Sequence, residues 1–127
     1  MPIQITSGIK VEVESRYLAS HSRPLEQYFI FPYYIRISND SDRPAKLISR
    51  HWLITDGFGT VREVEGDGVV GEQPYLLPGE QFEYTSWSSL VTPTGKMSGT
   101  FQMIDDLAQF FKVAIPSFTL VVPDLLN

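Results

Sequence analysis

The sequence predicts an all-β fold in which antiparallel strands form two packed sheets. Apolar and polar residues alternate with a period close to two through most of the chain, which is typical of strands with one buried face. Turn signals rich in Gly, Pro, Asn, Asp and Ser separate these segments. No segment carries a helical stripe of useful length, although residues 105–111 could form a single helical turn. We therefore expect a sandwich of about seven strands.

The first predicted strands cover residues 9–13, 28–37, 47–55 and 60–65. The second of them is apolar at almost every position, as expected of a strand that is covered on both faces. Pro32 interrupts it and predicts a bulge or an edge position, because proline cannot donate a ladder hydrogen bond. Asp56-Gly57 ends the third strand, since this dipeptide tolerates the positive φ of a hairpin turn.

Three further strands are expected around residues 82–84, over 97–103 and over 111–122. Pro78-Gly79 fits the two central positions of a type II turn ahead of the first of these. Pro116 should break the last one, because proline within sheets is confined to edges and bulges. The Cys-Trp-Cys spacing of antibody domains is missing. From the pattern of strands and turns we expect a fibronectin type III-like or immunoglobulin-like sandwich of antiparallel strands.

Composition and charge exclude several classes of protein. A chain of 127 residues with 43% hydrophobic and 20% charged residues is typical of one globular domain, which we place at residues 1–127. The net charge of −5 argues against nucleic acid as a partner, because phosphates are bound through Lys and Arg. The lack of cysteine excludes thiolate chemistry and fits a reducing compartment. Without a membrane-length apolar run or a secretory signal, we expect a cytoplasmic protein and no membrane partner.

A glycine-rich loop is the main candidate site. Residues 66–71 read G-x-G-x-x-G, the pattern of loops that hold dinucleotide phosphates. Such loops need a following helix whose N-terminus binds the pyrophosphate, and Pro74 argues against one. A weaker alternative stays open: backbone N–H groups could form an anion nest, with Gly66, Gly68 and Gly71 as the candidate residues. The simpler interpretation is that these glycines supply positive φ or close backbone approach in a turn.

Other polar groups are weaker candidates. Four carboxylates crowd the same loop, namely Glu63, Glu65, Asp67 and Glu72. Their spacing is not that of a dedicated cation site, so weak contact with Mg²⁺ or Co²⁺ is the most that they indicate. His21 and His51 are too few for a metal centre, and no G-x-S-x-G elbow supplies a nucleophile. We therefore assign no catalytic residue, no metal ligand and no cofactor.

Two strands supply candidate surfaces. Residues 28–34 are rich in Tyr and Phe, and at a sheet edge they could recruit another chain, although they could also fill the core. On the next strand Arg50 and Trp52 share one face. We expect Trp52 to anchor the core, and Arg50 to extend to the surface or pair with an acid.

Five segments, taken together, are similar to the bacterial ApaG family. They are RHWLITDG at 50–57, VEGDGVVGEQP at 64–74, LPGEQFEYTS at 77–86, GKMSGTFQM at 95–103 and IPSFTL at 115–120. The resemblance implies a fibronectin type III-like sandwich and a cytosolic bacterial protein, also called CorD, associated with cobalt resistance and magnesium efflux. Similar domains in eukaryotic F-box proteins and in a partner of DNA polymerase delta imply protein binding. The family's glycine motif, read as a pyrophosphate loop, falls on Gly66, Gly68 and Gly71.

Two positions depart from the family pattern. Trp87 stands where a small residue is more usual and places a large aromatic near a turn, and residues 105–108 replace a Gly-containing turn. The function we expect is a non-enzymatic module that binds an unidentified protein through a sheet edge, with a homodimer left open. The alternative is a sensor that binds pyrophosphate or a dinucleoside polyphosphate through Gly66–Gly71. Direct binding of a divalent cation is a third hypothesis.

Overall fold

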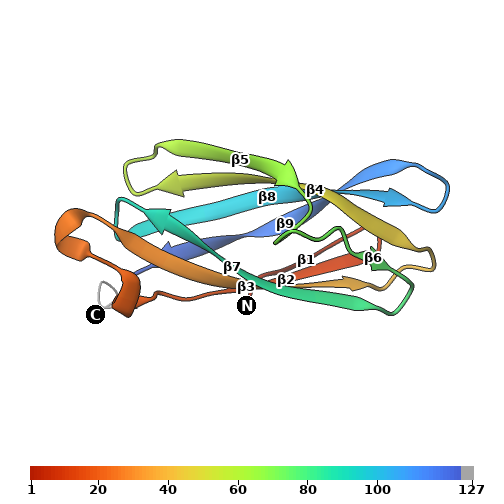
Figure 1. Cartoon of the computed structure of the whole chain (residues 1–127), viewed down its shortest axis with the longest axis horizontal. Helices are drawn as coiled ribbons and strands as arrows, with labels where there is room; N and C mark the ends of the chain where they lie inside the picture. Colours follow the sequence, from red (N-terminus) through yellow and green to blue (C-terminus); the bar gives the residue numbers. More distant parts are fainter. Residues whose placement is uncertain (124–127) are drawn as a thin grey trace.

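Two antiparallel sheets pack face to face in the computed structural model, which describes residues 1–123 (Figure 1). One sheet has the strand order β1-β2-β3-β7, and the other has the order β5-β4-β8-β9 with β6 also paired to β4. The predicted all-β sandwich is confirmed. Within residues 1–123 no helix is long and apolar enough to cross a membrane.

The strands are longer and more numerous than expected. The first sheet comprises β1 (Ile3–Thr6), β2 (Ile9–Ser15), β3 (Phe29–Asn39) and β7 (Gln81–Leu90). The second comprises β4 (Ala45–Asp56), β5 (Val61–Asp67), β6 (Tyr75–Leu76), β8 (Thr94–Asp105) and β9 (Phe110–Val121). Two short 3₁₀ turns, η1 (Ala19–His21) and η2 (Pro24–Glu26), join β2 to β3. Sequence analysis missed β1 and β6, because β1 buries no side chain fully and β6 is too short to show a period.

Alternation along the strands fills the space between the sheets. Val11 and Val13 of β2 and Ile35 of β3 are fully buried, and the intervening charged residues face solvent. Trp52 is only 3% exposed, and its ring packs edge-on against Tyr33 and Phe118 at centroid distances of 5.4 and 5.9 Å. The prediction that Trp52 anchors the core is confirmed.

Both prolines within strands are accommodated without breaking them. Pro32 lies in β3 with no register shift, so the predicted bulge is wrong. The Pro32 carbonyl faces β2 and accepts a hydrogen bond of 2.9 Å from the N–H of Arg16, the residue just after the end of β2. The backbone nitrogen of Pro32 faces the same side, where the β2–β3 ladder has ended and no N–H is needed. At Pro116 β9 continues, and the predicted break is instead a register shift against β8, on an edge strand.

The turns between strands follow the local chemistry of their residues. The predicted turn at Pro78-Gly79 is confirmed, because the Glu80 N–H bonds the Leu77 carbonyl at 2.9 Å and Gly79 has φ of 88°. Residues 105–109 form a hairpin turn rather than the helical turn that the sequence allowed. The Asp105 carboxylate accepts the N–H groups of Leu107 and Gln109, which fixes this turn without a helix.

The two long sides of the sandwich are closed differently. On one side β9 meets β1 and β2, since the Ala114 N–H donates to the Thr6 hydroxyl and the Ser15 hydroxyl donates to the Thr119 carbonyl. On the other side β5 and β7 are the outer strands of their sheets. There Arg62 spans the gap between the sheets through bonds to the Ser88 hydroxyl and the Ser89 carbonyl. The candidate surfaces lie around this second side.

Candidate functional site

The first glycine of the G-x-G-x-x-G pattern makes room for a side chain. Gly66 lies in β5 directly opposite Arg50 of β4. A Cβ atom at Gly66 would lie 2.8 Å from Nη1 of Arg50, so any larger residue would displace the guanidinium. That guanidinium donates from Nη1 to the carbonyl oxygens of Asp67 and Gly68, both at 3.0 Å. Arg50 therefore binds backbone carbonyl groups of the loop. Of the two roles expected for it, pairing with an acid does not occur among residues 1–123.

The rest of the loop is a tight hairpin closed by its own backbone. The Gly68 N–H donates to the Ile48 carbonyl at 2.8 Å, and Val69 and Glu72 exchange bonds of 2.8 and 2.9 Å. Between them Val70 and Gly71 have φ of 44° and 82°, which is the pattern of a two-residue type I′ turn. Three amides that an anion nest would use thus already donate to carbonyl groups. The geometry favours the turn interpretation, and anion binding at Gly66, Gly68 and Gly71 stays a prediction.

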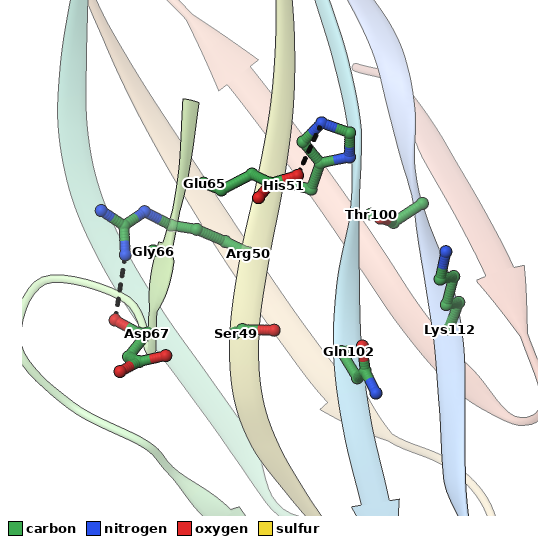
Figure 2. A pocket seen from close by; sticks show the side chains of 9 residues that line it. All are labelled: Ser49, Arg50, His51, Glu65, Gly66, Asp67, Thr100, Gln102 and Lys112. Atoms are coloured by element: carbon green, nitrogen blue, oxygen red, sulfur yellow. Dashed lines mark hydrogen bonds and ion pairs between the residues drawn. The ribbon is translucent and has the colours of Figure 1, made fainter. Parts of the chain in front are cut away.

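An open polar cavity of about 430 Å³ lies beside the loop on the second sheet. Figure 2 shows its lining side chains, which come from β4, β5, β8 and β9. They are Ser49, Arg50, His51, Glu65, Gly66, Asp67, Thr100, Gln102 and Lys112. This mixture of opposite charges and hydroxyl groups has no preference for one class of ligand.

His51 meets two carboxylates at this cavity. Its Nε2 atom lies 3.2 Å from Oε2 of Glu63 and 3.5 Å from Oε1 of Glu65, the second of which Figure 2 shows. Glu65 is the register partner of His51, and Glu63 shares its face through the period of two. Sequence analysis missed this cluster because strand pairing is not visible in a single sequence. An imidazole with two carboxylates suits a divalent metal, but a hydrogen bond between the imidazole and an exposed carboxylate explains the same geometry.

The outer edge of β7 is free in residues 1–123, where β7 pairs with β3 alone. The Asn39 N–H donates to the Glu80 carbonyl, so these two residues form a hydrogen-bonded pair. Hydrogen-bonded and non-bonded pairs alternate along an antiparallel ladder, which makes the pairs of Thr85 and Trp87 non-bonded. By this alternation the peptide groups of Thr85 and Trp87 point away from β3. Pro32 is the register partner of Trp87 and has no N–H to donate, which agrees with a non-bonded pair at this position. β7 therefore presents unpaired backbone groups beside the Arg62 bridge.

An apolar groove of about 480 Å³ runs next to this edge on the outer face of the first sheet. Its lining residues are Leu18, His21, Tyr28, Ile30, Pro32, Thr85, Ser86 and Trp87. Trp87 is 61% exposed and Tyr28 is 39% exposed, so two large aromatic side chains face solvent at this groove. Trp87 lies inside β7, so the expectation that it stands near a turn is wrong. Exposed aromatics beside free peptide groups form a surface able to hold an extended chain.

The predicted edge position of residues 28–34 is wrong. β3 pairs with β2 on one side and with β7 on the other, so it lies inside the sheet. Phe31 and Tyr33 are buried in the core, as the other reading of these aromatics required. The edge belongs to β7, one strand further out, and only Tyr28 and Ile30 contribute from this segment to the groove.

The family of the chain follows from comparison with known protein families. A model of the ApaG domain matches residues 19–105, which is more than half of the sequence. The chain belongs to the ApaG family. It is 49% identical to the ApaG protein of Anaeromyxobacter dehalogenans (strain 2CP-C) over 127 residues, which is the whole of both chains. It is also 49% identical to ApaG of Acidithiobacillus ferrooxidans (strain ATCC 53993) over 120 residues, or 94% of each chain.

A solved ApaG-type structure has the same fold. The crystal structure of the ApaA protein from Bordetella pertussis superposes with a TM-score of 0.88 at 46% sequence identity, and 96% of each chain is covered. The resemblance noted in the sequence is therefore confirmed for the family and for the fold. The names of these ApaG relatives state no ligand or partner, so the function is argued from the surfaces described above.

Proposed function

We propose that this ApaG-family protein is a non-enzymatic binding module that holds an extended segment of another protein along β7. The observation that carries the proposal is the outer edge of β7, which is unpaired within residues 1–123 and runs beside the groove of Trp87. A bound segment would add a strand to the first sheet, as many peptide-binding domains allow. This recognition needs no catalytic group and no cofactor.

The two parts of the surface divide the work of recognition. The outward peptide groups of Thr85 and Trp87 supply hydrogen bonds that are common to any extended chain. The groove supplies selectivity, because every second side chain of an added strand points to the outer face of the sheet. There it meets Trp87 and Tyr28, the type of side chain on which binding energy concentrates.

We place this binding role in the cytoplasm of a bacterial cell. The association of the family with cobalt resistance and magnesium efflux then runs through the bound protein rather than through a metal of the domain itself. The alternative, a sensor that binds pyrophosphate or a dinucleoside polyphosphate at Gly66–Gly71, has less support. The amides of Gly68, Val69 and Glu72 already donate within the protein, and a phosphate would have to displace those bonds.

A single backbone donor tests the proposal. Random peptides long enough to span β7 are displayed and selected against the immobilised protein, and the enriched peptides are then measured in solution. Thr85→Pro removes an outward N–H and leaves the bonds between β7 and β3 in place, so it should abolish binding of the selected peptides. Thr85→Val keeps the N–H and a similar side-chain shape, and it should bind as the native protein does.

The readout distinguishes edge pairing from other contacts. Amide NMR spectra of the complex should place the largest shifts on Gln81–Leu90, and the folded spectrum of Thr85→Pro confirms its integrity. Equal peptide binding by Thr85→Pro and Thr85→Val would contradict pairing at this edge. A selection that enriches no peptide above an unrelated sandwich domain would contradict the proposed function as a whole.

A further inference from the structure

A second cavity lies on the inner side of β7, between the two sheets at their open side. It has a volume of about 270 Å³. Its lining residues are Tyr33, Arg50, Trp52, Ile54, Arg62, Val64, Ser86, Trp87, Ser88, Ser89 and Met97. Trp87 and Ser86 also line the apolar groove, so the two cavities flank the same edge strand.

The charge of this inner cavity is opposite to that of the whole chain. Arg50 and Arg62 are its charged lining residues, whereas the chain carries a net charge of −5. The alternation of β5 explains the contrast, because Arg62 points inward to the cavity while Glu63 and Glu65 point to the outer face with His51. Among residues 1–123 neither arginine lies within ion-pair distance of a carboxylate.

Both arginines keep unused hydrogen-bond donors. Arg62 donates from Nη2 to the Ser88 hydroxyl at 3.2 Å and to the Ser89 carbonyl at 3.0 Å. Arg50 donates from Nη1 to the loop carbonyls. Each guanidinium has five N–H donors in a planar fork, and the other nitrogen atoms of both groups have no hydrogen-bond partner among residues 1–123. These groups face a cavity that also contains the hydroxyls of Ser86 and Tyr33.

We propose that this inner cavity binds a carboxylate side chain of the segment that pairs with β7, so that the recognised segment alternates apolar and acidic residues. The inference rests on the proposed function. Side chains of an added strand point in turn to the two faces of the sheet, so those opposite Thr85 and Trp87 reach the groove and those opposite Ser86 and Ser88 reach the arginines. A carboxylate is the group that the guanidinium fork pairs with in two parallel bonds.

The selected peptides themselves test the inference. Peptides enriched by the native protein should place Asp or Glu at every second position from an apolar residue. Binding of such a peptide, followed by fluorescence anisotropy, should weaken about tenfold in Arg62→Gln, because a hydrogen bond to a charged group is lost. Replacing its acidic residue by Asn or Gln should weaken binding to the native protein similarly and should not weaken binding to Arg62→Gln further.

A matched variant controls for net charge. Lys96 is exposed and does not line either cavity, so Lys96→Gln removes the same charge and should bind the peptide as the native protein does. Enriched peptides without acidic residues, or equal binding by Arg62→Gln and the native protein, would overturn the inference and leave the proposed function standing. If Thr85→Pro binds the same peptides unchanged, the proposed function fails, and the inference fails with it.

Discussion

The glycine loop and the edge of β7 differ in what their backbones leave unsatisfied. The loop carries a recognisable motif, yet Gly68, Val69 and Glu72 donate their N–H groups within the protein, and Arg50 covers two of its carbonyls. β7 carries no motif, yet the outward peptide groups of Thr85 and Trp87 have no hydrogen-bond partner among residues 1–123. The capacity of a segment to bind a ligand therefore depends on its free hydrogen-bond donors and acceptors, which a pattern of residue types does not reveal.

Gly68→Val should have the largest effect and would show how firmly the loop is closed. Gly68 has φ of 62°, and a Cβ atom there would collide with the Glu72 carbonyl oxygen. We expect a loss of about 3 kcal/mol in the free energy of unfolding, measured by urea denaturation. Gly71→Ala is the control, because φ there is 82° but the space around it is open, so it should cost about 1 kcal/mol. Equal costs would show that close approach is not what demands glycine.

Trp87→Ala should have the next largest effect, on binding rather than on folding. Its indole is exposed in the groove, so we expect stability to change by no more than about 0.5 kcal/mol. The affinity for a selected peptide should fall by about 2 kcal/mol, which titration calorimetry measures. Phe110→Ala removes a ring of similar exposure, 60%, from β9 and should leave affinity unchanged. Equal losses from both variants would argue that the groove is not selective.

Val70→Asn should stabilise the loop and sharpen the contrast with β7. A β-branched residue at φ of 44° is strained, whereas Asn before Gly is the preferred pair of a type I′ turn. The free energy of unfolding should rise by about 1 kcal/mol. Val61→Asn, at an exposed valine of β5 outside the turn, should give no increase. Peptide binding should stay the same in both variants, since neither residue lines the groove.

Ala108→Gly should have the smallest effect and would calibrate the backbone strain used above. The turns at Asp56–Thr60 and Asp105–Gln109 share the same hydrogen bonds, but the left-handed position holds Gly59 in one and Ala108 in the other. Ala108→Gly should stabilise by about 0.5 kcal/mol, because relief of strain exceeds the added unfolded-state entropy. Gly59→Ala should reverse the sign. Opposite results in thermal unfolding would discount strain as the cause.

Sequence predicted the layers of the molecule well and its exposed edges badly. Alternation identified the core strands because burial of one face leaves a period in the residues themselves. The sequence analysis placed the sheet edge at residues 28–34, because a strand that is apolar at almost every position has the same composition inside a sheet as at its edge. The meeting of His51 with Glu63 and Glu65, and of Arg62 with β7, depends on strand register and sheet packing. Those are properties of the folded chain and not of any segment.

The hydrogen bonds that close the far side of the sandwich also constrain when it can fold. Thr6 is bonded to Ala114 and Ser15 is bonded to Thr119, at separations of 108 and 104 residues. The pairing of β1, β2 and β3 with one another involves only residues 3–39, whereas this side of the sandwich closes only when β9 packs against β1 and β2. Such non-local pairing is typical of domains that fold in milliseconds to seconds. We infer that the sandwich is completed only after β9 has left the ribosome, because the contacts of β1 and β2 with β9 cannot form earlier.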